Sequence, residues 1–245
     1  VPSEIKDLTE LQELNIGYSS NSKGITELKP EIGQLSKLTR LDVSGHDLTS
    51  LPTEIGNLSS LKYLNVSNNE LSSLPIGIGS FTMLEELHLE YQESYNTSTG
   101  IRTKTLTTLP DEIGNIVSLK KLYLQNNKLT SLPSTIGGLS SLEVLNMERN
   151  QLTSLPSSVN NLTTLKEFLA NNNLIEGYLN LDNLTVLNRL KLGYNNISGL
   201  KINVAPTAFN IGSDNNSNTY YFDIKRNALG CIEVPSDELV SWQLS

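Results

Sequence analysis

A leucine pattern that recurs every 23 residues is the feature that most limits how this chain can fold. Two sets of leucines stand 23 residues apart: Leu38, Leu61 and Leu84, then Leu119, Leu142 and Leu165. The step between the two sets is 35 residues, which is one repeat with 12 residues inserted. Such self-similarity predicts a stack of equivalent coils, because each unit buries its apolar face against its neighbour.

Each unit carries the same order of apolar and turn-forming residues. One unit reads Leu119, Leu122, Leu124, Asn127, Leu129, Leu132, Pro133, Ile136 and Leu139. Leucines two positions apart share one face of a short strand, because side chains alternate along it. The Asn is expected to turn the chain and to bond backbone groups of the adjacent coil through its amide. Pro sets the return path, and we expect the Gly that often follows Ile to mark a sharp bend.

This pattern resembles the leucine-rich-repeat family, and its 23-residue LPxxIGxL form is similar to the Ras-group class of these repeats. The resemblance covers residues 1 to about 200 and returns over 222–232. It implies an α/β right-handed solenoid, with a curved parallel β-sheet on the concave face and irregular or 3₁₀ segments on the convex side. We expect nine strands, centred on Leu14, Leu41, Leu64, Leu87, Leu122, Leu145, Phe168, Leu190 and Phe222. The segment 201–220 is too irregular for a prediction.

The repeats predict a single domain over residues 1–245, with an insertion loop at 91–105 and a C-terminal cap at 233–245. Residues 1–8 match the second half of the unit at 51–58, so we expect the domain to be part of a longer protein. Ser236 is a candidate helix N-cap within the cap. The closing segment NALGCIEVP is similar to the last coil of repeat domains in secreted bacterial surface proteins. That similarity favours an extracellular or cell-surface location over the cytoplasmic alternative.

Composition limits the classes of partner. The formal net charge is −8 and the sequence has no run of Lys and Arg, so nucleic acids and anionic membrane surfaces are poor candidates. No apolar stretch approaches 18 residues, which argues against membrane insertion. Cys231 is the one cysteine, so an intramolecular disulfide cannot form.

The residues that could support chemistry are few. His46 occupies the repeat position that is normally Asn and is predicted to be a tolerated substitute in the turn. His88 has only Glu86 and Glu90 nearby, too few groups for a metal site of fixed geometry. Cys231 lies in a closing-coil pattern and is expected to be buried rather than reactive. We therefore expect no enzyme, no cofactor and no metal.

Binding is expected on the outward side chains of the strands and on the insertion, because repeat proteins use this extended surface for partners. The candidate residues are Tyr63, His88, Glu90, Tyr91, Tyr95, Arg102, Tyr123, Gln125, Glu148 and Arg149. Tyr and Arg are frequent in binding hot spots. The sequence thus predicts a non-catalytic protein-binding module. A carbohydrate-binding module and a cytoplasmic signalling scaffold of the Ras-group type remain as alternatives.

Overall fold

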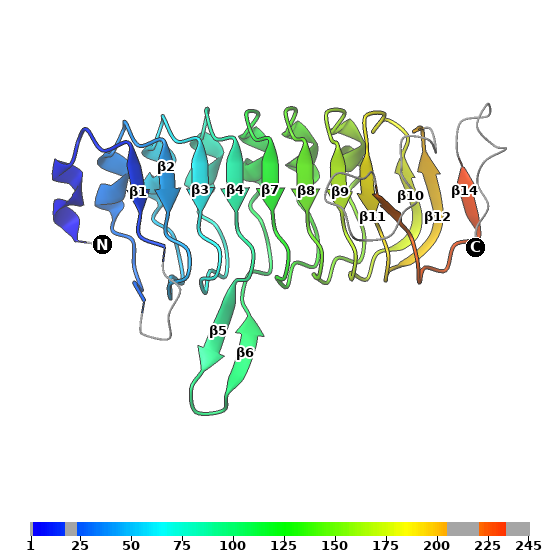
Figure 1. Ribbon diagram of the computed structural model, residues 1–245, viewed down its shortest axis with the longest axis horizontal. Coiled ribbons are helices and arrows are strands. Elements are labelled where there is room, and N and C mark those ends of the chain that lie inside the picture. Colours follow the sequence, from blue (N-terminus) through cyan, green and yellow to red (C-terminus); the bar gives the residue numbers. More distant parts are fainter. Residues whose placement is uncertain (1, 18–23, 205–220, 234–245) are drawn as a thin grey trace.

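The computed structural model describes residues 2–17, 24–204 and 221–233, and these form an elongated stack of coils (Figure 1). One parallel sheet of nine strands runs along the stack. Its strands are β1 (Glu13–Asn15), β2 (Arg40–Asp42), β3 (Tyr63–Asn65), β4 (Glu86–His88), β7 (Lys121–Tyr123), β8 (Val144–Asn146), β9 (Glu167–Leu169), β11 (Arg189–Lys191) and β13 (Tyr221–Asp223). The nine predicted centres are the middle residues of these strands, so the predicted register is confirmed.

Short 3₁₀ helices form the return path of the first coils. They are η1 (Ser3–Asp7), η2 (Pro30–Gln34), η3 (Thr53–Asn57), η4 (Ile76–Ser80), η5 (Asp111–Asn115), η6 (Ser134–Gly138) and η7 (Ser157–Asn161). A proline precedes or begins each of them, which fits its fixed φ at the first helical turn. The predicted 3₁₀ segments opposite the sheet are confirmed for these coils.

The last coils return differently. Their return path forms a second parallel sheet made of β10 (Glu176–Leu181), β12 (Asn196–Ile202) and β14 (Cys231–Glu233) (Figure 1). The LPxxIG signature is missing from these segments, and residues such as Leu179 and Leu181 alternate with polar ones instead. Extended backbone therefore replaces the 3₁₀ turn, a change that the sequence prediction did not include.

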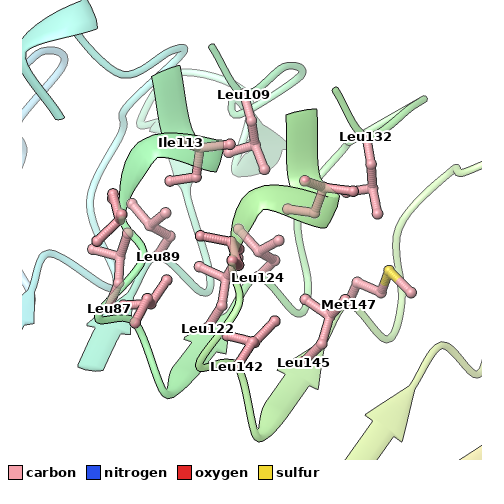
Figure 2. Packing of buried hydrophobic residues seen from close by; sticks show 14 of the residues in the cluster. Leu87, Leu89, Leu109, Ile113, Leu122, Leu124, Leu132, Leu142, Leu145 and Met147 are labelled. Carbon is pink, nitrogen blue, oxygen red and sulfur yellow. The ribbon is translucent and has the colours of Figure 1, made fainter. Parts of the chain in front are cut away.

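Leucine, isoleucine and phenylalanine side chains from successive coils fill the space between the sheet and the return path. Leu87, Leu122 and Leu145 lie side by side on neighbouring strands, and each is fully buried (Figure 2). Ile113 reaches the same layer from η5. Each coil therefore contributes an equivalent set of side chains to one continuous core.

Glycines in the 3₁₀ helices serve close packing rather than a sharp bend, which corrects the expectation for these positions. A Cβ on Gly56 would lie 2.1 Å from the carbonyl oxygen of Gly77, and one on Gly114 would lie 2.1 Å from that of Thr135. Neither glycine has a positive φ. Only glycine fits, because the backbones of adjacent coils nearly touch there.

The predicted asparagine position forms a ladder between coils. Oδ1 of Asn127 accepts a hydrogen bond from the backbone N–H of Gln92 at 3.0 Å. Its Nδ2 donates to the carbonyl oxygens of Leu89 and Leu124, both at 2.9 Å. The same arrangement recurs at Asn69, Asn150, Asn173, Asn195 and Asn227. The role predicted for this asparagine is confirmed.

His46 takes the asparagine's place in the second coil. Its Nδ1 accepts the backbone N–H of Ile25 at 3.2 Å, and its Nε2 lies 2.7 Å from the carbonyl oxygen of Ile16. A neutral ring with its proton on Nε2 satisfies both contacts. The predicted role of His46 as a substitute in the turn is confirmed.

Two expectations concern the C-terminal part. Cys231 is exposed, so the expectation of a buried thiol is wrong. Strand alternation is the reason, since Ile232 faces inward from β14 and its two neighbours face out. The cap predicted at 233–245 lies outside the described residues except for Glu233, and Ser236 and residues 205–220 lie outside them as well.

Candidate functional site

The side chains of the nine-stranded sheet that point away from the core form the surface that we name the strand face. Three rings stack across its centre. The His88 ring of β4 lies 4.5 Å from the Tyr123 ring of β7, with 24° between the planes. On the other side it lies 5.2 Å from the Tyr63 ring of β3. Each strand supplies one ring: the register pairs His88 with Tyr123, whereas Tyr63 stands at the other end of its strand, opposite Glu86, and meets His88 diagonally.

Charged groups surround this ring stack. The guanidinium of Arg40 lies 3.6 Å above the ring of Tyr63. His88 stands between two carboxylates, with Nε2 3.7 Å from Glu86 and Nδ1 3.3 Å from Glu90. Lys121 pairs with Glu86 at 2.8 Å. Glu86 therefore has a full cationic partner, whereas the nearest ionisable neighbour of Glu90 is an imidazole.

The partly covered setting of the stack changes the acidity of its groups. Burial raises the pKa of Tyr63 and of Tyr123, so both hydroxyls keep their protons at neutral pH and can donate hydrogen bonds. Burial would also raise the pKa of Glu86, but the hydrogen bond and charge of Lys121 outweigh it and hold that pKa below its usual value. The stack thus presents neutral phenols beside a neutralised ion pair.

Three polar atoms in this region are buried and have no hydrogen-bond partner within the described part of the chain. They are Nε2 of His88, Oε2 of Glu90 and Oε1 of Gln125. A buried polar atom without a partner costs about 1–3 kcal/mol. Water or a ligand can supply the missing partner, so these atoms make the centre of the strand face a candidate binding site.

The ring stack stands where several other coils make a local hydrogen bond between the last side chain of the strand and the backbone that follows it. Asp42, Asn65 and Asn146 occupy the last position of their strands, and each side chain accepts the backbone N–H two residues later. The equivalent residues in β4 and β7 are His88 and Tyr123, which cannot make this turn. Leu169 and Lys191 end β9 and β11 and have no side-chain acceptor either, so the turn is missing at the two coils that carry His88 and Tyr123 and at two later coils.

Beyond each strand of the sheet from β2 to β13 the chain passes through a left-handed position three residues after the strand end. We name this line of residues the rim. Tyr91 has φ +57° and Arg149 has φ +58° there, and both side chains are exposed. Glu148 lies one residue earlier, half-buried at the border of the strand face.

The insertion is an antiparallel hairpin of β5 (Glu93–Asn96) and β6 (Ile101–Lys104) that projects beyond the sheet (Figure 1). Arg102 lies 5.3 Å over the exposed ring of Tyr95. At the hairpin base, Nζ of Lys104 donates to the backbone oxygen of Arg149 at 3.1 Å. Burial lowers the pKa of Lys104. The charge of Glu93 acts in the opposite direction, and the positive charge of Arg149 lowers this pKa further.

The structure divides the candidate residues into three groups. Tyr63, His88, Glu90, Tyr123 and Gln125 lie together on the strand face. Tyr91, Glu148 and Arg149 follow the border and rim, and Tyr95 and Arg102 pair with each other on the hairpin.

The sequence-based candidates do not include Arg40 and Lys121 on the strand face, of which the sequence identifies Lys121 as an outward residue, or Tyr194 and Arg226 on the rim. All four stand at repeat positions equivalent to candidates in other coils, so the repeat alignment could have found them.

A metal site and a membrane-spanning helix are both absent from the described residues. No group of three or more His, Cys, Asp or Glu side chains within residues 2–17, 24–204 and 221–233 could hold a metal ion. No helix in the same ranges is long and apolar enough to cross a membrane.

A family model and a solved structure both match this chain to leucine-rich repeats. A model described as a leucine-rich repeat region matches residues 2–110 and 105–201, which together exceed half of the chain. A solved leucine-rich-repeat protein of Leptospira interrogans is 29% identical, with a TM-score of 0.71 over 96% of this chain and 63% of that one. No curated protein sequence matches.

Two further solved complexes are also similar in structure. The plant peptide hormone receptor RGFR1, solved with RGF2, is 27% identical at a TM-score of 0.63, and 94% of this chain covers 38% of it. PEPR1, solved with AtPEP1, is 26% identical at a TM-score of 0.60. The match covers 94% of this chain and 33% of PEPR1. The chain therefore spans less than two thirds of the length of each of these proteins.

Proposed function

The chain belongs to the leucine-rich-repeat family, and on that premise we propose that it is a non-catalytic protein-binding module whose partner docks on the strand face. The observation that carries this proposal is the Tyr63–His88–Tyr123 stack with the three unpartnered polar atoms around it. Tyrosines supply contact area and a hydroxyl, and the unpaired atoms of Glu90 and Gln125 need donors from outside.

A protein partner fits this surface better than a small ligand. The stack lies on an open sheet that spans nine strands, about 38 Å at 4.8 Å per step, which suits a contact spread over many residues. Two of the similar structures, RGFR1 with RGF2 and PEPR1 with AtPEP1, are solved complexes. Their likeness supports a binding role for the same kind of sheet here.

The finer assignment is part of the proposal. We place the chain in the 23-residue LPxxIGxL class of these repeats and in a larger extracellular or cell-surface protein. The class rests on the spacing of the units, and the location rests on the closing segment NALGCIEVP. Reading the complete open reading frame tests the location, because a signal peptide is required for export and its absence would favour the cytoplasmic alternative.

The test of the binding role uses a partner captured from an extract of the source organism on the immobilised chain. Calorimetry then compares the wild type with Tyr123→Ala and with a matched control, Tyr178→Ala. Tyr178 is an exposed tyrosine of β10 in the second sheet, away from the strand face. We expect Tyr123→Ala to weaken binding by about 1–2 kcal/mol or more, as for a hot spot, and Tyr178→Ala to leave it unchanged.

Equal affinities for these variants would contradict docking on the strand face. A captured glycan in place of a protein, verified by loss of binding after glycosidase treatment, would instead support the carbohydrate alternative.

A further inference from the structure

The rim carries residues that its backbone conformation disfavours. In eight coils the residue just before the ladder position has a positive φ, and in four of them it is Gly45, Asn68, Asn126 or Asn172, which tolerate that conformation. The other four are Tyr91, Arg149, Tyr194 and Arg226, with φ between 55° and 58°. The left-handed conformation costs more free energy for Tyr and Arg than for Gly or Asn, so these four residues reduce the stability of the fold.

Backbone contacts fix this conformation whatever the side chain. In the coils from Gly45 to Tyr194 the rim N–H donates to the next coil, as from Tyr91 to the oxygen of Gln125 at 3.2 Å and from Tyr194 to that of Lys225 at 2.8 Å. The same bond is made from Asn68 and from Gly45. The stack therefore requires the backbone conformation but does not require an aromatic or a cationic side chain there.

The four side chains are also exposed and make few contacts within the described ranges. The exposed fraction is 44% for Tyr91 and 39% for Tyr194, and both arginines are exposed. None of the ion pairs within the described ranges includes Arg149 or Arg226. Strained and exposed residues of the types found in hot spots, whose two arginines make no ion pair in the described ranges, indicate a function outside the fold.

Positive charge gathers at two points of this rim. The ammonium group of Lys104 meets the backbone oxygen of Arg149 at the hairpin base. At the far end, Arg226 lies 5.0 Å and Lys225 lies 5.6 Å from the centre of the Tyr194 ring. In a chain of net charge −8, the rim thus carries two cations at the hairpin base and, at its far end, two cations over a tyrosine ring, of which Lys225 also pairs with Asp223 at 3.6 Å.

We propose that the rim from Tyr91 to Arg226 binds an extended, acidic segment of a partner protein. Five coil steps separate these residues in the sheet order, which is about 24 Å at 4.8 Å per step. A strand rises about 3.3 Å per residue, so a segment of about seven residues covers the line. Its carboxylates pair with Arg149 and Arg226, and its chain lies against the rings of Tyr91 and Tyr194.

This surface is separate from the ring stack of the strand face and deepens the proposed protein-binding role. The experiment therefore needs variants of both regions. Random 12-residue peptides displayed on phage are selected on the immobilised full chain, and binding of the selected synthetic peptides is measured for Arg149→Asn, Arg226→Asn and Tyr123→Ala. Lys62→Asn is the matched control, because Lys62 is an exposed cation that precedes β3 at the opposite edge of the sheet.

We expect the selected peptides to be rich in Asp and Glu. Arg149→Asn and Arg226→Asn should each weaken their binding about tenfold or more, as expected for loss of a charge-assisted pair, and Lys62→Asn should not. Both rim variants should also raise Tm by about 2 °C, because Asn relieves the left-handed conformation. A rise in stability together with a loss of binding is an effect that a purely structural residue would not give.

Other results would overturn the proposal in distinct ways. Peptides without acidic residues, or a failure to select any acidic peptide, contradict the charge of the ligand. Peptides whose binding is lost in Tyr123→Ala but unchanged in the rim variants place the site on the strand face alone and leave the proposed function intact. A fall in Tm in both rim variants shows that these side chains support the fold instead.

Discussion

Replacing Asn127 by alanine removes one step of the ladder that joins successive coils. The side chain is 1% exposed and makes three hydrogen bonds, to the N–H of Gln92 and to the carbonyl oxygens of Leu89 and Leu124. Alanine leaves the N–H of Gln92 without a partner in the core, whereas the oxygens of Leu124 and Leu89 keep donors in Nδ2 of Asn150 at 2.9 Å and Nε2 of Gln92 at 3.3 Å. One unsatisfied buried group costs about 1–3 kcal/mol, so the free energy of unfolding falls by about that amount.

Urea denaturation followed by circular dichroism measures this change by linear extrapolation. Asn115→Ala is the matched control, because Asn115 is an exposed asparagine of η5 and should contribute within about 0.5 kcal/mol. A loss below about 1 kcal/mol for Asn127→Ala would refute the reasoning, since water or a local shift would then replace the ladder at little cost.

Three further outcomes follow from the same contacts. Leu122→Ala should destabilise by about 2–5 kcal/mol in urea because Leu122 is fully buried in a central coil, and a change under about 1 kcal/mol would show that the register is wrong. His46→Asn should leave the free energy of unfolding within about 1 kcal/mol of the wild type, because Asn restores the usual ladder contacts, and a larger loss would give the imidazole a role of its own. Deleting Ser94–Thr103 should leave a cooperative melting transition in calorimetry, because the N–H groups of Glu93 and Thr105 keep their hydrogen bonds to the oxygens of Asn69 and Gln92. A variant that is unfolded would show that the fold needs the hairpin.

The fold was predictable because one short pattern determines most of it. Residues such as Leu122 and Asn127 recur at fixed offsets, so their burial and hydrogen bonds in one coil hold for the others. The second sheet was missed because no comparable pattern describes β10 and β12, where alternation replaces the LPxxIG signature. The role of the repeat glycines was also misjudged, since the distance between neighbouring coils, as at Gly56 and Gly77, is not readable from local sequence.

The candidate site was predictable only in part. Strand alternation identifies Tyr63, His88 and Tyr123 as outward residues, and their position in the repeat places them on neighbouring coils. It does not reveal that the three rings stack or that Glu90 keeps an unpartnered oxygen, because both depend on side-chain rotamers. The strain at the rim depends on backbone dihedral angles, which sequence reasoning did not assign to Tyr194.

Photo-crosslinking at the ring stack tests the central claim most directly. The full chain is made with p-benzoylphenylalanine in place of Tyr123 or, as the control, in place of Tyr178 of the second sheet, and each protein is irradiated in an extract of the source organism. Docking on the strand face predicts a protein adduct from position 123, identified by mass spectrometry, and none from position 178. Adducts from position 178 with none from position 123 would contradict the account.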